Sequence, residues 1–232
     1  MIAPLLLLAL AAPIDDARAA LLKGDYVTAA RAYGEVAGAS PGCADLEYDL
    51  GTVAAQAAQV GPAVLHLERA LKLSPWDGDA RQNLEKVRGK RVDKVAANEL
   101  GDSPWQRLLL GLPSSALAWL AIVLWAAAFL LLAVFRRKAI RRAATAGLLL
   151  AILLGAMGYA GTKASAIQYG VVLAPTGQGV KVHSGPAADL PSSFEVHEGL
   201  KVLIQEQANG FTKIRLANGL EGYVLDEAVE EI

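Results

Sequence analysis

The sequence is poor in the residues that build most covalent and catalytic sites. Its 232 residues include one cysteine, Cys43, and three histidines. A single cysteine excludes an internal disulfide, so any domain of this chain is stabilised by packing alone. Cys43 itself is open to two interpretations: a small residue at the start of a helix, or a thiol that pairs between molecules.

Motifs of the common catalytic sites are also scarce. The sequence has no G-x-x-x-x-G-K-[ST] phosphate loop and no H-E-x-x-H zinc motif. The histidines, His66, His183 and His197, fall in separate segments, so their spacing predicts no metal site. The sequence therefore predicts a protein that is not an enzyme and that uses no cofactor or metal.

Charge is nearly balanced overall but is missing from two long segments. The chain has 22 Lys and Arg against 23 Asp and Glu, which excludes the basic character typical of nucleic-acid binding. Residues 115–135 and 143–162 contain no charged side chain. Because a helix needs about 20 apolar residues to cross the hydrocarbon core, both segments are predicted to be transmembrane helices. In the second one, Gly147, Ala151 and Gly155 form a stripe of small residues that is expected to face the first.

The two apolar segments are separated by residues 136–142, in which five of the seven residues are basic. These predicted topology determinants are Arg136, Arg137, Lys138, Arg141 and Arg142. Lys and Arg in short loops stay cytoplasmic, so the loop is predicted inside the cell and both flanking soluble parts outside it. Residues 1–12, with an apolar run and alanines near a possible cleavage site, are predicted to be the signal peptide for this export. They are either cleaved near Ala11 or Ala12, or kept as a tether.

Residues 13–101 contain an internal repeat. Ala29, Tyr33 and Pro41 recur 34 positions later as Ala63, Leu67 and Pro75. This period, with small, large and proline residues at those spacings, is typical of tetratricopeptide repeats and predicts an all-α solenoid. A further helix from Asp77 is predicted to cap the solenoid.

Such solenoids bind peptides or protein segments on a concave surface. Six polar residues are predicted to line that surface: Tyr48, Thr52, Gln56, Gln82, Asn83 and Lys86. The alternative is a solvated face without a specific ligand. The basic cluster from Arg81 to Lys94 is likewise either a solvated helix surface or a surface that attracts lipid headgroups.

Residues 102–113 precede the first apolar segment. Trp105, Arg107 and a run of leucines ended by Pro113 predict a short helix that lies in the membrane interface. The lipid bilayer is therefore an expected partner of this segment as well as of the two spans.

Residues 170–232 alternate apolar and polar residues and predict a small all-β barrel. Asn209-Gly210 and Asn218-Gly219 are strong hairpin signals between strands. The apolar positions expected in the core are Val202, Ile204, Ile214, Leu216, Tyr223 and Val224. Together with the V-x-V-H-S-G-P segment from Val180 to Pro186 and with Glu198-Gly199, this region resembles a bacterial SH3 domain. That family has Arg where this chain has His183, and Trp where it has Phe211 and Tyr223. Phe211 and Tyr223 are expected in the core, and ligand contact is the alternative.

The order of these parts resembles BatE-type proteins of the Bacteroides aerotolerance family. The resemblance implies a protein of the bacterial inner membrane with both soluble domains in the periplasm. It also implies two kinds of partner: membrane proteins with von Willebrand factor A domains, and a MoxR-type ATPase. Two functions remain open, a scaffold that recruits proteins through the repeats and a module that binds peptidoglycan through the SH3 domain. A signal transducer is less favoured, because a loop of seven residues offers little to signal with.

Overall fold

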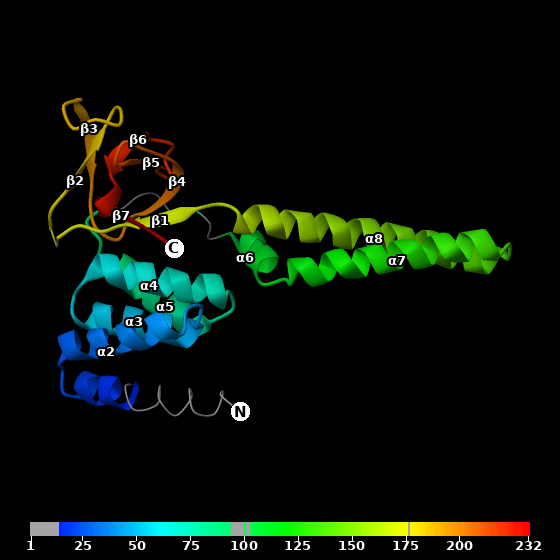
Figure 1. Ribbon diagram of the computed structural model, residues 1–232, viewed down its shortest axis with the longest axis horizontal. Helices are drawn as coiled ribbons and strands as arrows, with labels where there is room; N and C mark the ends of the chain where they lie inside the picture. The colour runs from blue at the N-terminus through cyan, green and yellow to red at the C-terminus, as the bar shows by residue number, and fades with distance from the viewer. Residues whose placement is uncertain (1–13, 94–99, 101–102, 176) are drawn as a thin grey trace. The chain divides into compact units, whose positions relative to one another are not determined.

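The computed structural model describes residues 14–93, 100, 103–175 and 177–232 (Figure 1). The predicted signal peptide, residues 1–12, lies outside the described residues. The chain forms two compact units, one from residues 1–100 together with 168–232 and one from residues 101–167. The first unit holds helices and an antiparallel sheet, and the second holds two long apolar helices. The predicted fold class is therefore confirmed in its coarse form, as helical and sheet parts with an apolar helix pair.

The helical part of the first unit is a series of short helices joined by tight turns. Residues 14–22 are helical, and four helices follow: α2 (Tyr26–Ala39), α3 (Ala44–Gln56), α4 (Val60–Leu73) and α5 (Gly78–Arg88). Two aspartates cap helices in the usual way, by accepting hydrogen bonds from free backbone N–H groups. Asp25 accepts from Thr28 at the start of α2, and Asp77 accepts from Asp79 and Ala80 at the start of α5. The helix predicted from Asp77 is thus confirmed.

The closest helix contact in this part joins α3 to α4. A Cβ atom added at Gly51 would lie 2.7 Å from Leu67 Cγ, so only glycine permits the observed approach. Ala63, predicted at the close contact of these helices, is fully buried together with Leu67. The small and large residues of the repeat pattern, Ala29, Tyr33, Ala63 and Leu67, therefore lie in the core, whereas Pro41 is exposed.

Replacing Ala63 by leucine is expected to lower the free energy of unfolding. The added atoms have no space in this buried position, and such overpacking costs about 1–3 kcal/mol. Urea denaturation of the detergent-solubilised full chain, followed by circular dichroism, measures the change. Ala39→Leu, at the exposed end of α2, is the matched control and is expected to change stability by less than about 0.5 kcal/mol. Equal stability of the two variants would contradict the tight packing at Ala63.

The sheet of the first unit has seven antiparallel strands in the order β3-β2-β6-β5-β4-β1-β7. They are β1 (Tyr169–Val172), β2 (Val180–His183), β3 (Ser192–Val196), β4 (Lys201–Ala208), β5 (Phe211–Arg215), β6 (Glu221–Leu225) and β7 (Val229–Glu231). Asn209 and Gly210 join β4 to β5 with φ angles of 54° and 79°. Positive φ at both central positions is the geometry of a two-residue hairpin, so this predicted turn is confirmed.

The core of the sheet follows the predicted alternation, with two corrections: Ile204, predicted in the core, is only half-buried and lies outside the buried cluster, and so does Tyr223. Four of the expected core residues belong to the buried cluster: Val202, Ile214, Leu216 and Val224. Phe211 is also buried, with 6% of its surface exposed. Tyr223 lies outside the cluster, and its hydroxyl donates a hydrogen bond to the Glu206 carboxylate. Neighbouring residues of a strand face opposite sides, so Tyr223 cannot share the core with Val224.

The second unit contains α6 (Pro104–Leu110), α7 (Ser114–Val134) and α8 (Lys138–Ser165). Helices α7 and α8 are long and apolar enough to cross a membrane. Only Phe135–Arg137 separates them, so the loop is shorter than the predicted residues 136–142. Lys138, Arg141 and Arg142 belong to α8, because no glycine or proline interrupts the helix between Lys138 and Ala146.

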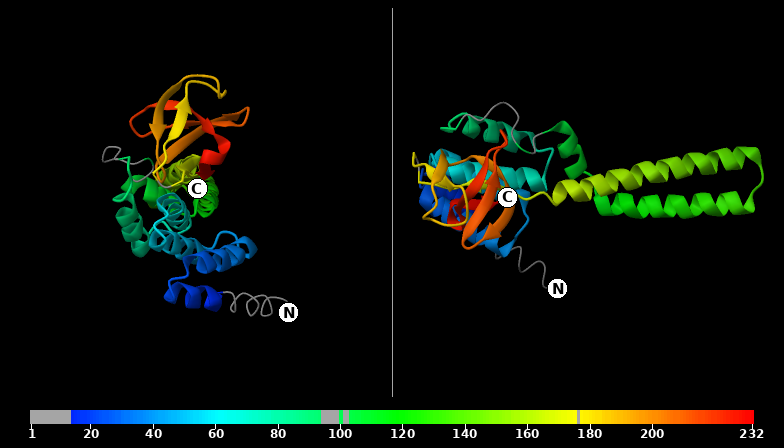
Figure 2. Two further views of the ribbon diagram at one scale, coloured as in Figure 1. Left: turned by 90° about the vertical axis from the view of Figure 1, so that its left-hand side faces the viewer. Right: turned by 90° about the horizontal axis from the view of Figure 1, so that it is seen from above.

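Helices α7 and α8 pack against each other through small residues, as Figure 2 shows for the antiparallel pair. Cβ atoms added at Gly147 and Gly155 would lie 3.8 Å from the Cβ atoms of Ala128 and Ala121. Ala151, between the two glycines, is buried. The predicted small-residue stripe therefore faces the other helix, which is how helices associate closely in lipid.

Candidate functional site

A buried carboxylate joins the helical part to the sheet. Glu68 of α4 has only 5% of its surface exposed. It accepts a hydrogen bond of 2.7 Å from Lys201 Nζ on β4 and another from the guanidinium of Arg88 on α5. A buried carboxylate needs such partners, since its charge is costly to remove from water. Two cations from opposite sides of the interface stabilise it here.

The start of α4 lies close to the sheet. A Cβ atom added at Gly61 would lie 3.2 Å from Leu173 Cδ2 and 3.4 Å from the Val172 carbonyl oxygen. The Gly61 amide donates a hydrogen bond of 3.1 Å to the buried Glu198 carboxylate. The glycine thus lets the helix approach the sheet, and the carboxylate satisfies one of the free N–H groups of its first turn.

Further contacts extend along both sides of this interface. Asp93 accepts a hydrogen bond of 2.6 Å from the His197 backbone amide, and its second oxygen lies 2.9 Å from His197 Nδ1. At the other side, Arg69 Nε donates to the Glu231 carbonyl at 3.1 Å, and Lys72 Nζ to the Ile232 carbonyl at 2.6 Å. Figure 1 shows α4 beside β1 and β7. The sheet therefore covers this face of α4, which leaves other helix faces for partners.

The six residues predicted to bind a partner lie on α3 and α5. Asn83 Nδ2 of α5 donates a hydrogen bond of 3.1 Å to the Tyr48 hydroxyl of α3, so the structure brings these two together. Lys86 Nζ donates to Gln82 Oε1 at 3.3 Å on the exposed side of α5. Thr52 Oγ1 is buried without a hydrogen-bond partner among the described residues. Gln56 is exposed at the end of α3.

A second polar cluster, which the repeat spacing did not reveal, lies between α3 and helical residues 14–22. Burial raises the pKa of the Asp49 carboxyl, and the Arg18 charge opposes that change. Burial also raises the pKa of Tyr33, and the charge of Asp49 acts in the same direction. The signal in the sequence was the pair Asp45 and Asp49, which are four residues apart and therefore neighbours on one helix face.

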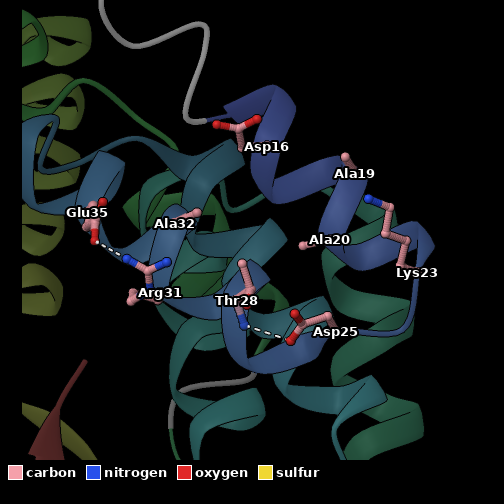
Figure 3. A pocket seen from close by; sticks show the side chains of 9 residues that line it. All are labelled: Asp16, Ala19, Ala20, Lys23, Asp25, Thr28, Arg31, Ala32 and Glu35. Atoms are coloured by element: carbon pink, nitrogen blue, oxygen red, sulfur yellow. Dashed lines mark hydrogen bonds and ion pairs between the residues drawn. The ribbon is translucent and has the colours of Figure 1, made fainter.

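An open groove lies between helical residues 14–22 and α2 (Figure 3). Its volume is about 580 Å³. The first side presents Asp16, Ala19, Ala20 and Lys23. The second side presents Asp25, Thr28, Arg31, Ala32 and Glu35. The groove thus has alanines between charged residues, and the Arg31 guanidinium lies 3.3 Å from the Glu35 carboxylate.

The exposed surface of the sheet carries mixed polar and aromatic residues. His183 on β2 is the register partner of Tyr223 on β6, and Lys213 on β5 pairs with the other side of Tyr223. The Lys213 ammonium lies 6.0 Å from the Tyr223 ring centroid. The His183 ring meets the buried Phe211 edge-on, at 6.1 Å between centroids. Phe211 is therefore a packing residue, and Tyr223 is the aromatic side chain available at this surface.

Cys43 and Ser40 lie at the ends of helices in the first unit. Cys43 is half-buried at the start of α3 and packs against the cluster around Tyr33. Residues 38–42 read G-A-S-P-G and match the G-x-S-x-G pattern, so the expectation that the sequence lacks this motif is wrong. That motif requires a strand before the serine and a helix after it. Ser40 instead ends α2 and precedes α3, so this segment is a turn between helices.

No group of three or more His, Cys, Asp or Glu side chains that could hold a metal ion occurs in the described part of the chain. The remaining features are polar surfaces and grooves on a folded unit joined to two long apolar helices.

Comparison with known proteins assigns no family to this chain. No protein-family model matches the sequence, and no curated protein is similar to it. Among solved structures, NlpC2 from Trichomonas vaginalis is similar over 28% of this chain, with 22% sequence identity and a TM-score of 0.26. The chain spans a quarter of that protein, since the match covers 25% of its length.

Proposed function

We propose that this protein is a non-enzymatic, membrane-anchored scaffold that binds a partner protein through the surface of α3 and α5. The observation that carries the proposal is the position of the Tyr48–Asn83 pair. Its polar surface belongs to helices α3 and α5, while the sheet covers a face of the neighbouring helix α4. Peptide-binding solenoids present the first helices of their repeats in this way.

We also propose a more specific fold for the two parts of the first unit, tetratricopeptide repeats and an SH3-like domain. Two helix pairs, residues 14–22 with α2 and α3 with α4, follow each other with the buried alanines Ala29 and Ala63 34 residues apart. This supports two tetratricopeptide repeats with α5 as a cap. The antiparallel order of short strands and the two Asn-Gly turns support an SH3-like domain at residues 170–232.

The contacts between the helical part and the sheet support a location of both parts on the same side of the membrane. Glu68 and Lys201 are separated by 133 residues, which include both apolar helices, yet they form a buried ion pair. Two segments of one compact unit cannot lie on opposite sides of a membrane. The chain must therefore cross an even number of times, which two spans satisfy. With the basic residues at the α7–α8 connection, we place the unit in the periplasm and the anchor in the bacterial inner membrane.

The partner type follows from the resemblance to BatE-type proteins. Membrane proteins with von Willebrand factor A domains, in a system with a MoxR-type ATPase, are the proposed partners. They would meet the α3–α5 surface on the periplasmic side.

The triple variant Gln82→Ala, Asn83→Ala, Lys86→Ala is expected to bind its partner much more weakly than the starting protein does. The three residues leave α5 folded because the buried Ala80, Leu84 and Val87 hold that helix. Crosslinked co-purification from native membranes, quantified by mass spectrometry, is expected to fall about tenfold, as for loss of central interface contacts. Asp79→Ala with Glu85→Ala, on exposed positions of the same helix, is the control. Unchanged co-purification would contradict the proposed surface.

Binding to peptidoglycan is the second candidate, because Tyr223 presents an accessible ring beside His183. The full chain serves for this test, since removing residues 170–232 would uncover the face of α4 around Glu68. Sedimentation with purified peptidoglycan that depends on Tyr223 and not on Asn83 would favour this candidate over the scaffold.

A further inference from the structure

The groove of Figure 3 has a feature that the proposed function does not use: its charges are complementary to themselves. On its first side, Asp16 lies on the helix, and Lys23 lies seven residues later, in the turn that follows the helix. Ala19 and Ala20 lie between them. When two copies of such a face meet antiparallel, each aspartate meets the lysine of the other copy, and the alanines meet at the centre. A two-fold interface requires this kind of self-complementarity.

The size of the side chains fits the same arrangement. Ala19, Ala20 and Ala32 leave the groove open between charged residues, so another helix can approach closely. The second side repeats the pattern on α2, where Thr28, Arg31, Ala32 and Glu35 have the same spacing. The two helix ends on either side of the turn beside the groove expose large apolar side chains, Leu22 at 89% and Val27 at 81%.

We infer that this groove binds a second copy of the same chain, with helical residues 14–22 of the two copies packed antiparallel around a two-fold axis near Ala19 and Ala20. Each copy contributes two helices, residues 14–22 and α2, so that the dimer contact is a four-helix arrangement. A helix of nine residues is only about 14 Å long, so the contact is small. Attachment to one membrane would raise the effective concentration and favour such a contact. This inference goes beyond the scaffold function and does not require the α3–α5 surface.

Cysteine crosslinking in membranes that carry the full chain tests the inference. In a Cys43→Ser background, Ala19→Cys lies next to the proposed axis, within the distance that a disulfide can bridge. Mild oxidation is expected to give a covalent dimer. Glu85→Cys, exposed on α5, is the matched control and is expected to remain monomeric. Absence of a dimer above this control, or crosslinking of Ala19→Cys only to a different protein, would overturn the inference.

A charge exchange makes the test specific for the proposed geometry. Asp16→Lys or Lys23→Glu places like charges opposite each other and is expected to lower the dimer yield about tenfold. The double variant Asp16→Lys with Lys23→Glu restores opposite charges and is expected to recover the yield. Circular dichroism of all three variants is expected to be unchanged, because both positions are exposed. A double variant as poor as the single ones would show that these residues do not face each other.

Discussion

Replacing Glu68 by alanine is expected to separate the sheet from the helices. The substitution leaves the buried Lys201 ammonium and the largely buried Arg88 guanidinium without their common carboxylate. Removing one partner of a buried ion pair costs about 3–5 kcal/mol, because the remaining charge is uncompensated. Urea denaturation of the detergent-solubilised full chain measures the loss. Hydrogen exchange is expected to accelerate first in β1 and α4, which meet at this interface.

The control for this experiment is Glu230→Ala. Glu230 forms an ion pair of 2.9 Å with Arg69 at the same interface, but half of its side chain is exposed. Exposed pairs contribute about 0–1 kcal/mol. If Glu68→Ala and Glu230→Ala had equally small effects, the buried ion pair would not be what holds the two parts together.

Replacing all five basic residues between α7 and α8 with glutamine is expected to scramble the orientation in the membrane. Arg136, Arg137, Lys138, Arg141 and Arg142 are the residues that retain this end in the cytoplasm. In a Cys43→Ser background, Glu85→Cys and Glu227→Cys report the side of the soluble unit through a membrane-impermeant maleimide. The starting protein is expected to label at both positions in intact cells with a permeable outer envelope. The glutamine variant is expected to give a mixture of labelled and protected molecules.

A charge-preserving variant separates charge from side-chain shape. Changing the four arginines to lysine keeps all five charges and is expected to keep the orientation. Both cysteine probes are expected to report the same side in every variant, because they belong to one compact unit. Uniform labelling of the glutamine variant would show that other features set the topology.

Much of the local structure could be predicted because its signals are local. Asp77 correctly predicts the start of α5, and Asn209-Gly210 correctly predicts the turn between β4 and β5. In both cases the side chain or the backbone freedom of one or two residues determines the geometry. The stripe of Gly147 and Gly155 also indicated its neighbour correctly, since the short connection leaves α7 as the helix within reach.

Spacing along the chain does not by itself say which way a side chain points or where a helix begins. The alternating pattern predicts both Tyr223 and Val224 in the core, but neighbouring residues of a strand face opposite sides, so only Val224 is buried. The charges of residues 136–142 predict a loop, whereas α8 already begins at Lys138, because Lys and Arg form helices about as readily as Leu does.

By itself, the sequence determined the elements: the helix pairs, the two apolar segments, the strands and most of their core residues. Each of these depends on spacing within about 30 neighbouring residues, as repeats and amphipathic patterns do. The tertiary structure alone decided that the helices and the sheet form one unit around Glu68, and that Asp16 and Lys23 share an open groove. The sequence around Glu68 gives no sign that this residue is buried. One of its partners, Arg88, belongs to α5, and the other, Lys201, belongs to β4 and lies 133 residues away. Such contacts depend on which helix surface packs against which sheet surface, and this packing cannot be predicted from a local sequence pattern.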